Sequence, residues 1–248
     1  NYAEGSSTTA ANGQTAGGDA HFGAGRSDDY YKNVLGRNGI DGIGTPAYSR
    51  VHYSNSYDNA FWSDSCFCMT YGDGNSFLTL TAIDVAGHEM THGVCSRTAK
   101  LTYRAESGGL NEANSDILLT RGDCEGRGGS GSTIGNSGGN WTIGEQLATP
   151  SFNRPLRYMY KPSLDGSSPN AWSSSLKRLD VHYSSGPANR MFYFLSQGAS
   201  NVSTSNFYSS YLPGGMTGIG NDKAARIWYK ALVSYMTSST NYAGAKTA

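Results

Sequence analysis

The residues His88-Glu89-Met90-Thr91-His92 place two imidazoles and a carboxylate at a spacing that could support metal chemistry. On a helix, positions i and i+4 share one face, about 6 Å apart at Cβ, so His88 and His92 can reach one zinc ion. Glu89 projects from the adjoining side, where it can act on a water activated by the zinc without binding the metal itself. A chance occurrence is the alternative, but the chain has only 5 histidines, and two flanking a glutamate at this spacing are improbable.

A third ligand is expected on the next predicted helix. A catalytic zinc takes three protein ligands and keeps one open position. A turn between two antiparallel helices would bring the carboxylate of Glu112 back over the histidine pair. Asp116 lies one helical turn later on the same face, where it could accept the second ring N–H of a zinc-bound histidine. A solvated helix face is the alternative, but both carboxylates stand among small and apolar residues in the run GLNEANSDILL. We therefore predict a zinc site formed by His88, His92 and Glu112.

The elements that carry these residues divide the chain into a strand-rich first third and a helix-rich remainder. Residues 1–25 are rich in Gly, Ala, Ser, Thr and Asn and are expected to form an arm with, at most, short strands. A short helix is expected at 28–35, and the Gly-rich run 124–145 is expected to be a long functional or ion-held loop. Hydrophobic periodicity and turn signals predict strands in 48–62 and 66–74 and helices in 80–96, 107–123, 184–200 and 221–236.

The composition is that of a folded domain without net charge. A length of 248 residues suits one large domain or two small lobes. Only 15% of residues are charged, and 17 Tyr, 4 Trp and 8 Phe argue against intrinsic disorder. The 19 basic and 19 acidic residues give no overall attraction to nucleic acid or anionic lipid. We therefore expect no nucleic-acid partner. No stretch approaches 18 uninterrupted apolar residues, so we expect no membrane span.

The first residue and the cysteines bear on the compartment. The chain begins with Asn1 rather than Met and shows no basic region followed by an apolar one, so we expect a processed product. Gly, Ser, Thr, Asn and Tyr are plentiful and Lys is scarce, a composition common in exported proteins, so we expect a secreted, extracellular protein. Four cysteines allow two disulfides in three pairings, and the sequence does not choose among them. Cys66 and Cys68 are so close that a bond between them would be strained. Without a C-x2-C pair, a zinc cluster of the four cysteines, which include Cys95 and Cys124, is not expected.

Five segments of the sequence carry a family resemblance: NAFWS, YGDG, HEMTH, ESGGLNEANSD and DVHYSSGPANR. With them the chain resembles the thermolysin family of neutral metalloendopeptidases over about residues 30–236. The resemblance implies an α+β, two-lobe fold with a strand-rich N-terminal lobe at 1–81, a central zinc-binding helix at 82–97 and a mainly helical C-terminal lobe at 98–248. Both ends look shortened, since many relatives have a longer front and further C-terminal helices. One catalytic Zn²⁺, polypeptide substrates and a monomer are expected.

The resemblance also implies roles in catalysis. His182 matches the histidine that stabilises the oxyanion of the tetrahedral intermediate, and Asp180 matches the carboxylate that orients it. Tyr103 matches a second oxyanion donor, and Asn111 matches a residue that supports His92. Without the resemblance, a histidine in a loop is more often structural, and Tyr103 would be taken as a half-exposed packing residue.

Substrate contacts are implied in the same way. Asn59 and Ala60 match edge-strand positions that hydrogen-bond the substrate as an added strand. Arg157 matches the guanidinium that holds a substrate backbone carbonyl, a task suited to its planar fork; its alternative is a surface salt bridge. Five apolar residues match the pocket for the residue after the scissile bond: Phe77, Leu80, Val85, Ile143 and Leu156. A preference for Leu or Phe at that substrate position is then expected. The alternative is that these five residues belong to the ordinary hydrophobic core.

A calcium site is implied more weakly. Asp84, Asp123 and Glu145 match the main calcium site of the family, which needs clustered oxygen ligands. Asn140 and Thr142 stand where the family often has acids, so they could supply an amide oxygen and a backbone carbonyl. Fewer carboxylates predict either a lower affinity or one Ca²⁺ in place of two, so one or two Ca²⁺ ions are expected.

The predicted function is therefore a secreted zinc endopeptidase that prefers a bulky hydrophobic residue on the amine side of the scissile bond. A zinc aminopeptidase would need an acidic group to hold a free amine, and no such motif is present. A binding module with structural zinc would be closed by four protein ligands, and Glu89 and His182 argue against it.

Overall fold

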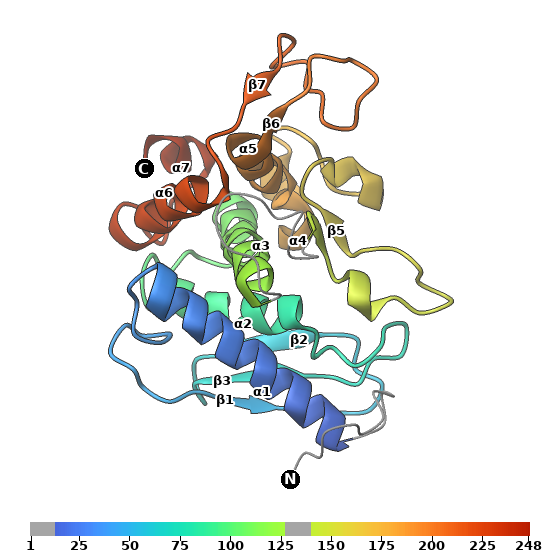
Figure 1. Cartoon of the computed structure of the whole chain (residues 1–248), viewed down its shortest axis with the longest axis vertical. Helices are drawn as coiled ribbons and strands as arrows, with labels where there is room; N and C mark the ends of the chain where they lie inside the picture. The colour runs from blue at the N-terminus through green and yellow to red at the C-terminus, as the bar shows by residue number, and fades with distance from the viewer. Residues whose placement is uncertain (1–12, 127–139) are drawn as a thin grey trace.

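A small sheet and two helices form the N-terminal part of the chain, as the computed structural model shows (Figure 1). The structure describes residues 13–126 and 140–248. Strands lie in the order β1-β3-β2, with β1 (Tyr48–Arg50) parallel and β2 (Ala60–Ser63) antiparallel to the central β3 (Cys68–Tyr71). Strand β2 is therefore an edge strand, whose outer backbone groups can pair with another extended chain.

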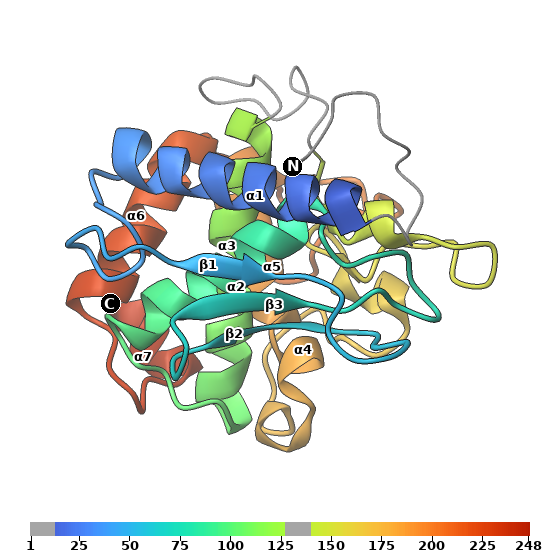
Figure 2. The same ribbon diagram turned by 90° about the horizontal axis from the view of Figure 1, so that it is seen from below.

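Helix α1 (Gly13–Asp29) corrects the expectation of an arm with short strands over residues 1–25. It crosses the sheet beside β1, as Figures 1 and 2 show, and continues into the π-helical turn η1 (Tyr30–Val34), where a separate short helix was expected. Its Gly and Ala residues predicted a loop, but they permit close packing against the next helix. An added Cβ at Gly23 would lie 2.6 Å from the Cβ of Ala86, so the two backbones approach closely.

Helices α2 (Ile83–Ser96) and α3 (Ala105–Gly126) form the centre of the molecule, close to the predicted ranges. Small residues again set their distance, because an added Cβ at Gly87 would lie 3.3 Å from the Cβ of Leu119. Nearly every residue of α2 is buried, including its polar side chains, because the sheet, α1 and α3 surround it. Polar groups held inside in this way need partners. Helix α3 supplies them for His88 and His92, whereas Thr91 pairs with Tyr31 of η1 and Asp84 accepts from the Gly144 N–H.

The C-terminal part is mainly helical. Helix α5 (Gly186–Gln197) and helix α6 (Asn221–Ser234) occupy the predicted ranges and pack against α3, where Trp228 Nε1 donates to Asn114 Oδ1 at 2.6 Å. Two-stranded ladders join β4 (Thr142–Ile143) with β5 (Arg157–Tyr158) and β6 (Gly198–Ala199) with β7 (Met216–Thr217). The short helical elements are η3 (Glu145–Leu147), η4 (Pro162–Asp165), η5 (Leu176–Arg178), α4 (Val181–Ser184) and α7 (Tyr242–Thr247).

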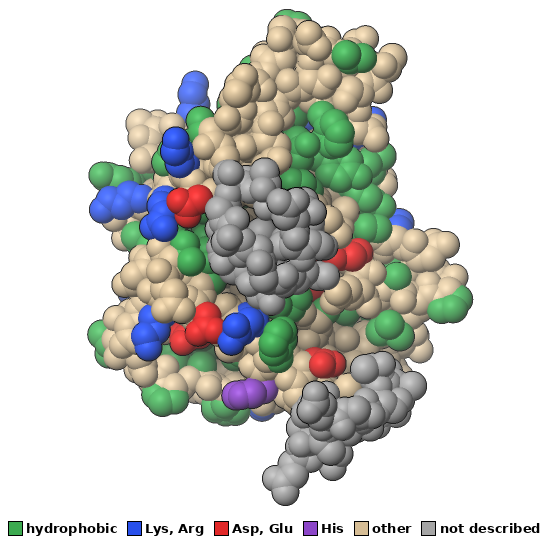
Figure 3. Space-filling view, viewed as in Figure 1, with side chains coloured by type: hydrophobic (Ala, Val, Ile, Leu, Met, Phe, Trp, Pro, Cys, Tyr) green, Lys and Arg blue, Asp and Glu red, His purple; other side chains and the backbone are tan. Residues whose placement is uncertain are grey.

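The predicted α+β fold is confirmed, although helix α1 precedes the strands. One cluster of buried apolar residues extends from Ala20 in α1 to Leu232 in α6. The lobe boundaries at 81/82 and 97/98 stay a prediction. Within the described ranges, no helix has both the length and the apolar character needed to cross a membrane. On the face seen in Figure 3, the described acidic and basic side chains stand beside each other in small groups, without a broad patch of one sign.

The cysteines are placed as follows. Cys66 and Cys68 form a disulfide in the hairpin between β2 and β3, although their closeness had counted against this pairing. Cys95 is free and buried in the core at the end of α2. The side chain of Cys124 lies outside the described residues.

Candidate metal centre and active site

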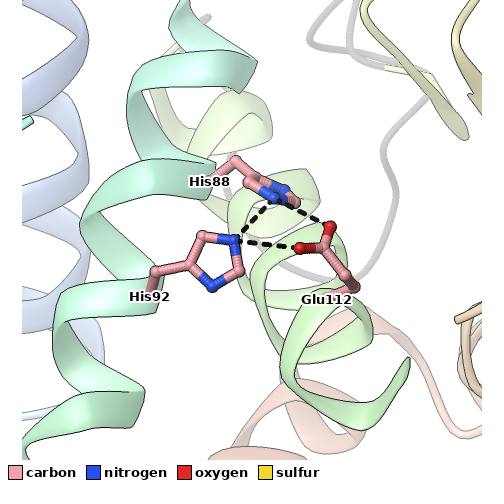
Figure 4. A group of neighbouring side chains, drawn as sticks. All are labelled: His88, His92 and Glu112. Carbon is pink, nitrogen blue, oxygen red and sulfur yellow. Dashed lines mark hydrogen bonds and ion pairs between the residues drawn. The ribbon is translucent and has the colours of Figure 1, made fainter. Parts of the chain in front are cut away.

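Three side chains from two helices converge on one point, as Figure 4 shows. His88 and His92 project from the same face of α2, and their Nε2 atoms lie 3.0 Å apart. Glu112 enters from α3, with Oε2 at 3.3 Å from His88 Nε2 and Oε1 at 3.4 Å from His92 Nε2. The i, i+4 spacing and the antiparallel second helix thus produce the cluster that the sequence predicts.

The donor set fits a zinc ion. Two imidazole nitrogens and a carboxylate form the ligand set of one class of catalytic zinc sites. With zinc–ligand distances of about 2.0–2.1 Å, tetrahedral ligands lie about 3.3 Å from each other, close to the three separations seen here. Within the described residues, His88, His92 and Glu112 are the group of histidine, cysteine and acidic side chains able to share one metal ion. A fourth protein ligand is not among them, which leaves a position for water or substrate.

Two further side chains of α3 orient the histidines. Asp116 Oδ1 lies 3.0 Å from His88 Nδ1, and Asn111 Oδ1 lies 2.7 Å from His92 Nδ1. Both contacts place the N–H on Nδ1, so each Nε2 keeps its lone pair for the metal. Asn111 is itself held, because its Nδ2 donates to Leu101 O at 2.9 Å. These geometries agree with the support roles expected of Asp116 and Asn111.

The electrostatics of the cluster favour a cation. Burial would raise the pKa of Glu112, but neighbouring His92 and His88 outweigh it and hold that pKa well below its ordinary value. Burial also opposes ionisation of Asp116, yet Arg157 and His88 lower its pKa to about 2. Burial lowers the pKa of His88, but Asp116 and Glu112 more than offset this and raise it to about 10. Two buried negative charges therefore attract either protons or a metal ion to the imidazoles.

The expected oxyanion donors lie beside the cluster. Tyr103 Oη donates to Glu112 Oε1 and lies 3.3 Å from His182 Nε2. Asp180 Oδ1 accepts from the backbone N–H of His182 at 3.0 Å, as the N-cap of α4, and lies 2.7 Å from His182 Nδ1. Asp180 thus orients the ring so that Nε2 faces Tyr103 and Glu112. Tyr103 is about half exposed, which leaves its hydroxyl accessible from the cleft.

A cleft of about 730 Å³ opens over these groups. It is lined by Glu89, the metal cluster, Tyr103 and His182, and by most of the substrate residues that the sequence predicts: Asn59, Ala60, Leu80, Val85, Ile143, Leu156 and Arg157. Phe77 is not among the lining residues, and its ring packs edge-on against Phe152 at 4.8 Å between centroids. Sequence reasoning missed Phe61, Trp62 and Leu147, which also line the cleft. The NAFWS segment could have pointed to the first two, whereas Leu147 carries no such signal.

This chain belongs to the thermolysin metallopeptidase family. A model of the thermolysin metallopeptidase catalytic domain matches residues 1–96, and a model of the thermolysin metallopeptidase alpha-helical domain matches residues 99–248. The family predicted from the sequence is thereby confirmed.

Relatives of this thermolysin metallopeptidase include the transglutaminase-activating metalloprotease of Streptomyces mobaraensis, 55% identical over 94% of this chain and 30% of the relative. Thermolysin of Alicyclobacillus acidocaldarius is 38% identical over 100% of this chain and 43% of the relative. The chain thus spans less than half the length of these curated relatives. Among solved structures, the precursor of protealysin, a metalloproteinase from Serratia proteamaculans, has a TM-score of 0.75 and 28% identity, covering 98% of this chain and 73% of that one.

The Arg157 side chain is largely buried, unlike the side chain of a surface salt bridge. Its Nε and Nη2 donate to Asp116 Oδ2 and Oδ1 at 2.7 and 2.6 Å, while its side chain still lines the cleft. Burial disfavours its charge, but Asp116 outweighs this and raises the pKa of Arg157 above its ordinary value. Asn189 Nδ2 also donates to Asp116 Oδ2 at 2.7 Å, so the carboxylate is fully bonded.

The residues expected to bind calcium lie in two places. Asn140, Thr142 and Glu145 bond to one another, with Thr142 Oγ1 3.1 Å from Glu145 Oε2 and Asn140 Nδ2 3.2 Å from Glu145 Oε1. Asp84 Oδ2 accepts from Gly144 N–H at 2.5 Å, which joins α2 to this loop. The side chain of Asp123 lies outside the described residues. Calcium binding stays a prediction.

Proposed function

We propose that this chain hydrolyses internal peptide bonds as a zinc endopeptidase. The observation that carries the proposal is the cluster of His88, His92 and Glu112, open on one side to a cleft that also contains Glu89 and His182. A structural zinc site would be closed by a fourth protein ligand, and it would not need a carboxylate beside the metal.

Zinc, when bound, supplies Lewis-acid chemistry: it lowers the pKa of water and polarises a carbonyl. Glu89 lies one position after His88 on α2 and lines the cleft without belonging to the ligand cluster. Its carboxylate would take the proton from the attacking water and pass it to the leaving amine, a general acid–base step worth about 10²–10⁴-fold in rate. Burial of Glu89, which is only 6% exposed, keeps bulk water from competing for that proton.

Tyr103 and His182 would hold the oxygen of the scissile carbonyl. Tyr103 Oη and His182 Nε2 lie 3.3 Å apart at the edge of the cluster, close enough to donate to one oxygen between them. A donor of this kind contributes about 2.7–4 kcal/mol to transition-state stabilisation when it is preorganised. Asp180 supplies that preorganisation for His182, whereas Tyr103, whose single O–H donates to Glu112 in this structure, would turn that O–H to the carbonyl oxygen.

The cleft wall supports the substrate preference. The outer edge of β2 beside Asn59 and Ala60 can hydrogen-bond an extended peptide. Next to it, Leu80, Val85 and Ile143, together with Leu156 and Leu147, form an apolar recess. Arg157, anchored by Asp116, can donate to a backbone carbonyl of the same peptide. We infer that a bulky hydrophobic residue such as Leu or Phe is preferred on the amine side of the scissile bond.

The surroundings of the enzyme belong to the same proposal. A disulfide and a composition poor in Lys support a secreted, extracellular protein. A Ca²⁺ ion near Asp84, Asn140, Thr142 and Glu145 would connect the loop of the last three residues to α2. The enzyme would act as a monomer, with polypeptides as its substrates. The zero net charge argues against a nucleic-acid partner.

The test uses peptides blocked at both ends that contain a single Leu or Phe. The protein should cleave them before that residue, lose activity with a zinc chelator and regain it with added zinc. An aminopeptidase would cleave only after a free amine is provided, which would contradict the endopeptidase. Casein digestion that proceeds unchanged in chelator would contradict a catalytic metal.

A further inference from the structure

The cleft wall contains two charged side chains, Asp64 and Lys100, that the proposed chemistry does not use. Asp64 is already bonded, because Trp62 Nε1 and Ser96 Oγ donate to its Oδ1 at 2.9 and 2.8 Å, and Arg97 lies 3.3 Å away. Lys100 is exposed, and its ammonium takes part in none of the hydrogen bonds or ion pairs found within 13–126 and 140–248. Lys100 therefore brings an uncompensated positive charge to the cleft.

The backbone does not account for a lysine at this position. Lys100 has φ +55°, in the left-handed region that glycine adopts without strain, and its N–H donates to Cys95 O at 2.8 Å after the end of α2. Any side chain here carries a conformational cost that glycine would avoid. The turn after α2 therefore does not require a lysine, and what distinguishes its side chain is its place in the cleft.

The location of Lys100 follows from the direction of α2. Val85 marks the apolar recess at the start of the helix, whereas Ser96 lies about 16 Å farther along the axis, and both line the cleft. His88 and His92 stand between these two ends. Lys100 follows Ser96, so it lies on the opposite side of the metal cluster from the recess.

Strand β2 runs in the same direction as α2. An added Cβ at Gly93 would lie 2.9 Å from the Trp62 ring, and Asp64, just after the strand, bonds to Ser96. A peptide whose amine-side residue fills the recess therefore extends its acyl-side residues toward Lys100. Such a peptide would lie antiparallel to the edge strand.

We propose that Lys100 gives this enzyme a preference for an acidic side chain two or three residues before the scissile bond. The inference rests on the proposed endopeptidase function. From His92 to Ser96 the helix rises about 6 Å, and an extended peptide advances about 3.4 Å per residue. The second or third residue on the acyl side therefore comes within reach of the lysine, where a Glu or Asp carboxylate would pair with its ammonium and a Lys or Arg would be repelled.

The test compares three blocked peptides that share a Leu after the scissile bond and differ only in a Glu, Gln or Lys placed two, and then three, residues before it. The ratio of kcat/KM for the Glu and Lys peptides is measured within each protein, so general losses of activity cancel. At one of the two positions we expect a ratio of about 3–10 in the unmodified protein, in keeping with an exposed ion pair, and a fall toward 1 at high salt.

Substitution should then change the ratio in a defined order. Lys100→Gln should bring it close to 1, and Lys100→Glu should bring it below 1. Lys223→Glu makes the same charge change on an exposed residue of α6 that does not line the cleft, and it should leave the ratio unchanged. Equal ratios in the unmodified protein and Lys100→Glu would overturn this inference while cleavage of the Gln peptide still upheld the endopeptidase. No cleavage of any peptide, with zinc bound, would overturn both.

Discussion

The carboxylate of Asp116 lies 3.0 Å from Nδ1 of His88, and neither side chain is more than slightly exposed. With the Asp116 carboxylate beside Nδ1, a neutral His88 ring carries its N–H on Nδ1 and keeps the Nε2 lone pair free for a metal. Both oxygens of Asp116 also accept from Arg157. One buried carboxylate thus holds both His88, the proposed zinc ligand, and Arg157, a cation of the cleft.

The substitution Asp116→Asn should weaken zinc binding. An amide can still accept from one neighbour, but it removes the charge that stabilises His88 and Arg157, and loss of such support typically costs 10–100-fold in metal affinity. Competition with a chromogenic chelator measures the affinity. The matched control is Asp165→Asn, which removes a buried carboxylate bonded to Ser167 and Ser168 outside the cleft. Equal zinc affinities in the two variants would contradict a role for Asp116 in orienting His88.

The substitution Glu89→Gln should stop turnover without releasing zinc. Glu89 lines the cleft but lies outside the ligand cluster, so the amide keeps the shape and loses the base. We expect kcat/KM to fall by about 10²–10⁴-fold, with the same zinc content by elemental analysis as the unmodified protein. Loss of zinc would mean that Glu89 is a ligand, and retained activity would exclude it as the base.

The substitution His182→Ala should lower kcat by about 10²–10³-fold with little change in KM, because an oxyanion donor acts only in the transition state. His52→Ala is a close control: His52 is also paired with an aspartate, since its Nδ1 lies 2.6 Å from Asp73 Oδ1, but it does not line the cleft. Steady-state kinetics on one blocked peptide compares both variants. An effect of His182→Ala on KM alone would make it a binding residue.

The sequence predicted the metal site because its geometry is local. The spacing of His88 and His92 within one helix, and of Asn111, Glu112 and Asp116 within the next, is determined by the 3.6-residue repeat. Only the turn between the helices had to be assumed. The structure places Glu112 opposite the two histidines (Figure 4), with Asn111 and Asp116 beside their rings.

Features that depend on tertiary packing were harder to predict. Helix α1 is rich in glycine and alanine, and its helical state depends on contact with α2 through positions such as Gly23 and Ala86. The position of Lys100 in the cleft could not be predicted either, because it depends on a left-handed backbone conformation of Lys100 itself just after the end of α2.

The substitution Gly93→Ala tests how closely α2 packs under the cleft. A Cβ at Gly93 would lie 2.7 Å from Cγ2 of Ile40 and 2.9 Å from the ring of Trp62, so Ile40 and the Trp62 side chain on edge strand β2 would have to move. Overpacking of this kind costs about 1–3 kcal/mol of unfolding free energy. Because Trp62 lines the cleft, its displacement should also raise KM for the blocked peptides.

The control for this prediction is Gly25→Ala in α1, where an added Cβ meets nothing within 4 Å. There the alanine should raise the free energy of unfolding by about 0.5–1 kcal/mol. The position is helical in the folded protein, and alanine has less conformational freedom than glycine in the unfolded chain. Thermal unfolding of the two variants should therefore shift Tm in opposite directions. If the Gly93→Ala and Gly25→Ala proteins were equally stable and KM were unchanged, the prediction would be wrong. The cleft wall would then accommodate the added methyl group, and α2 would not need a small residue where it packs against β2.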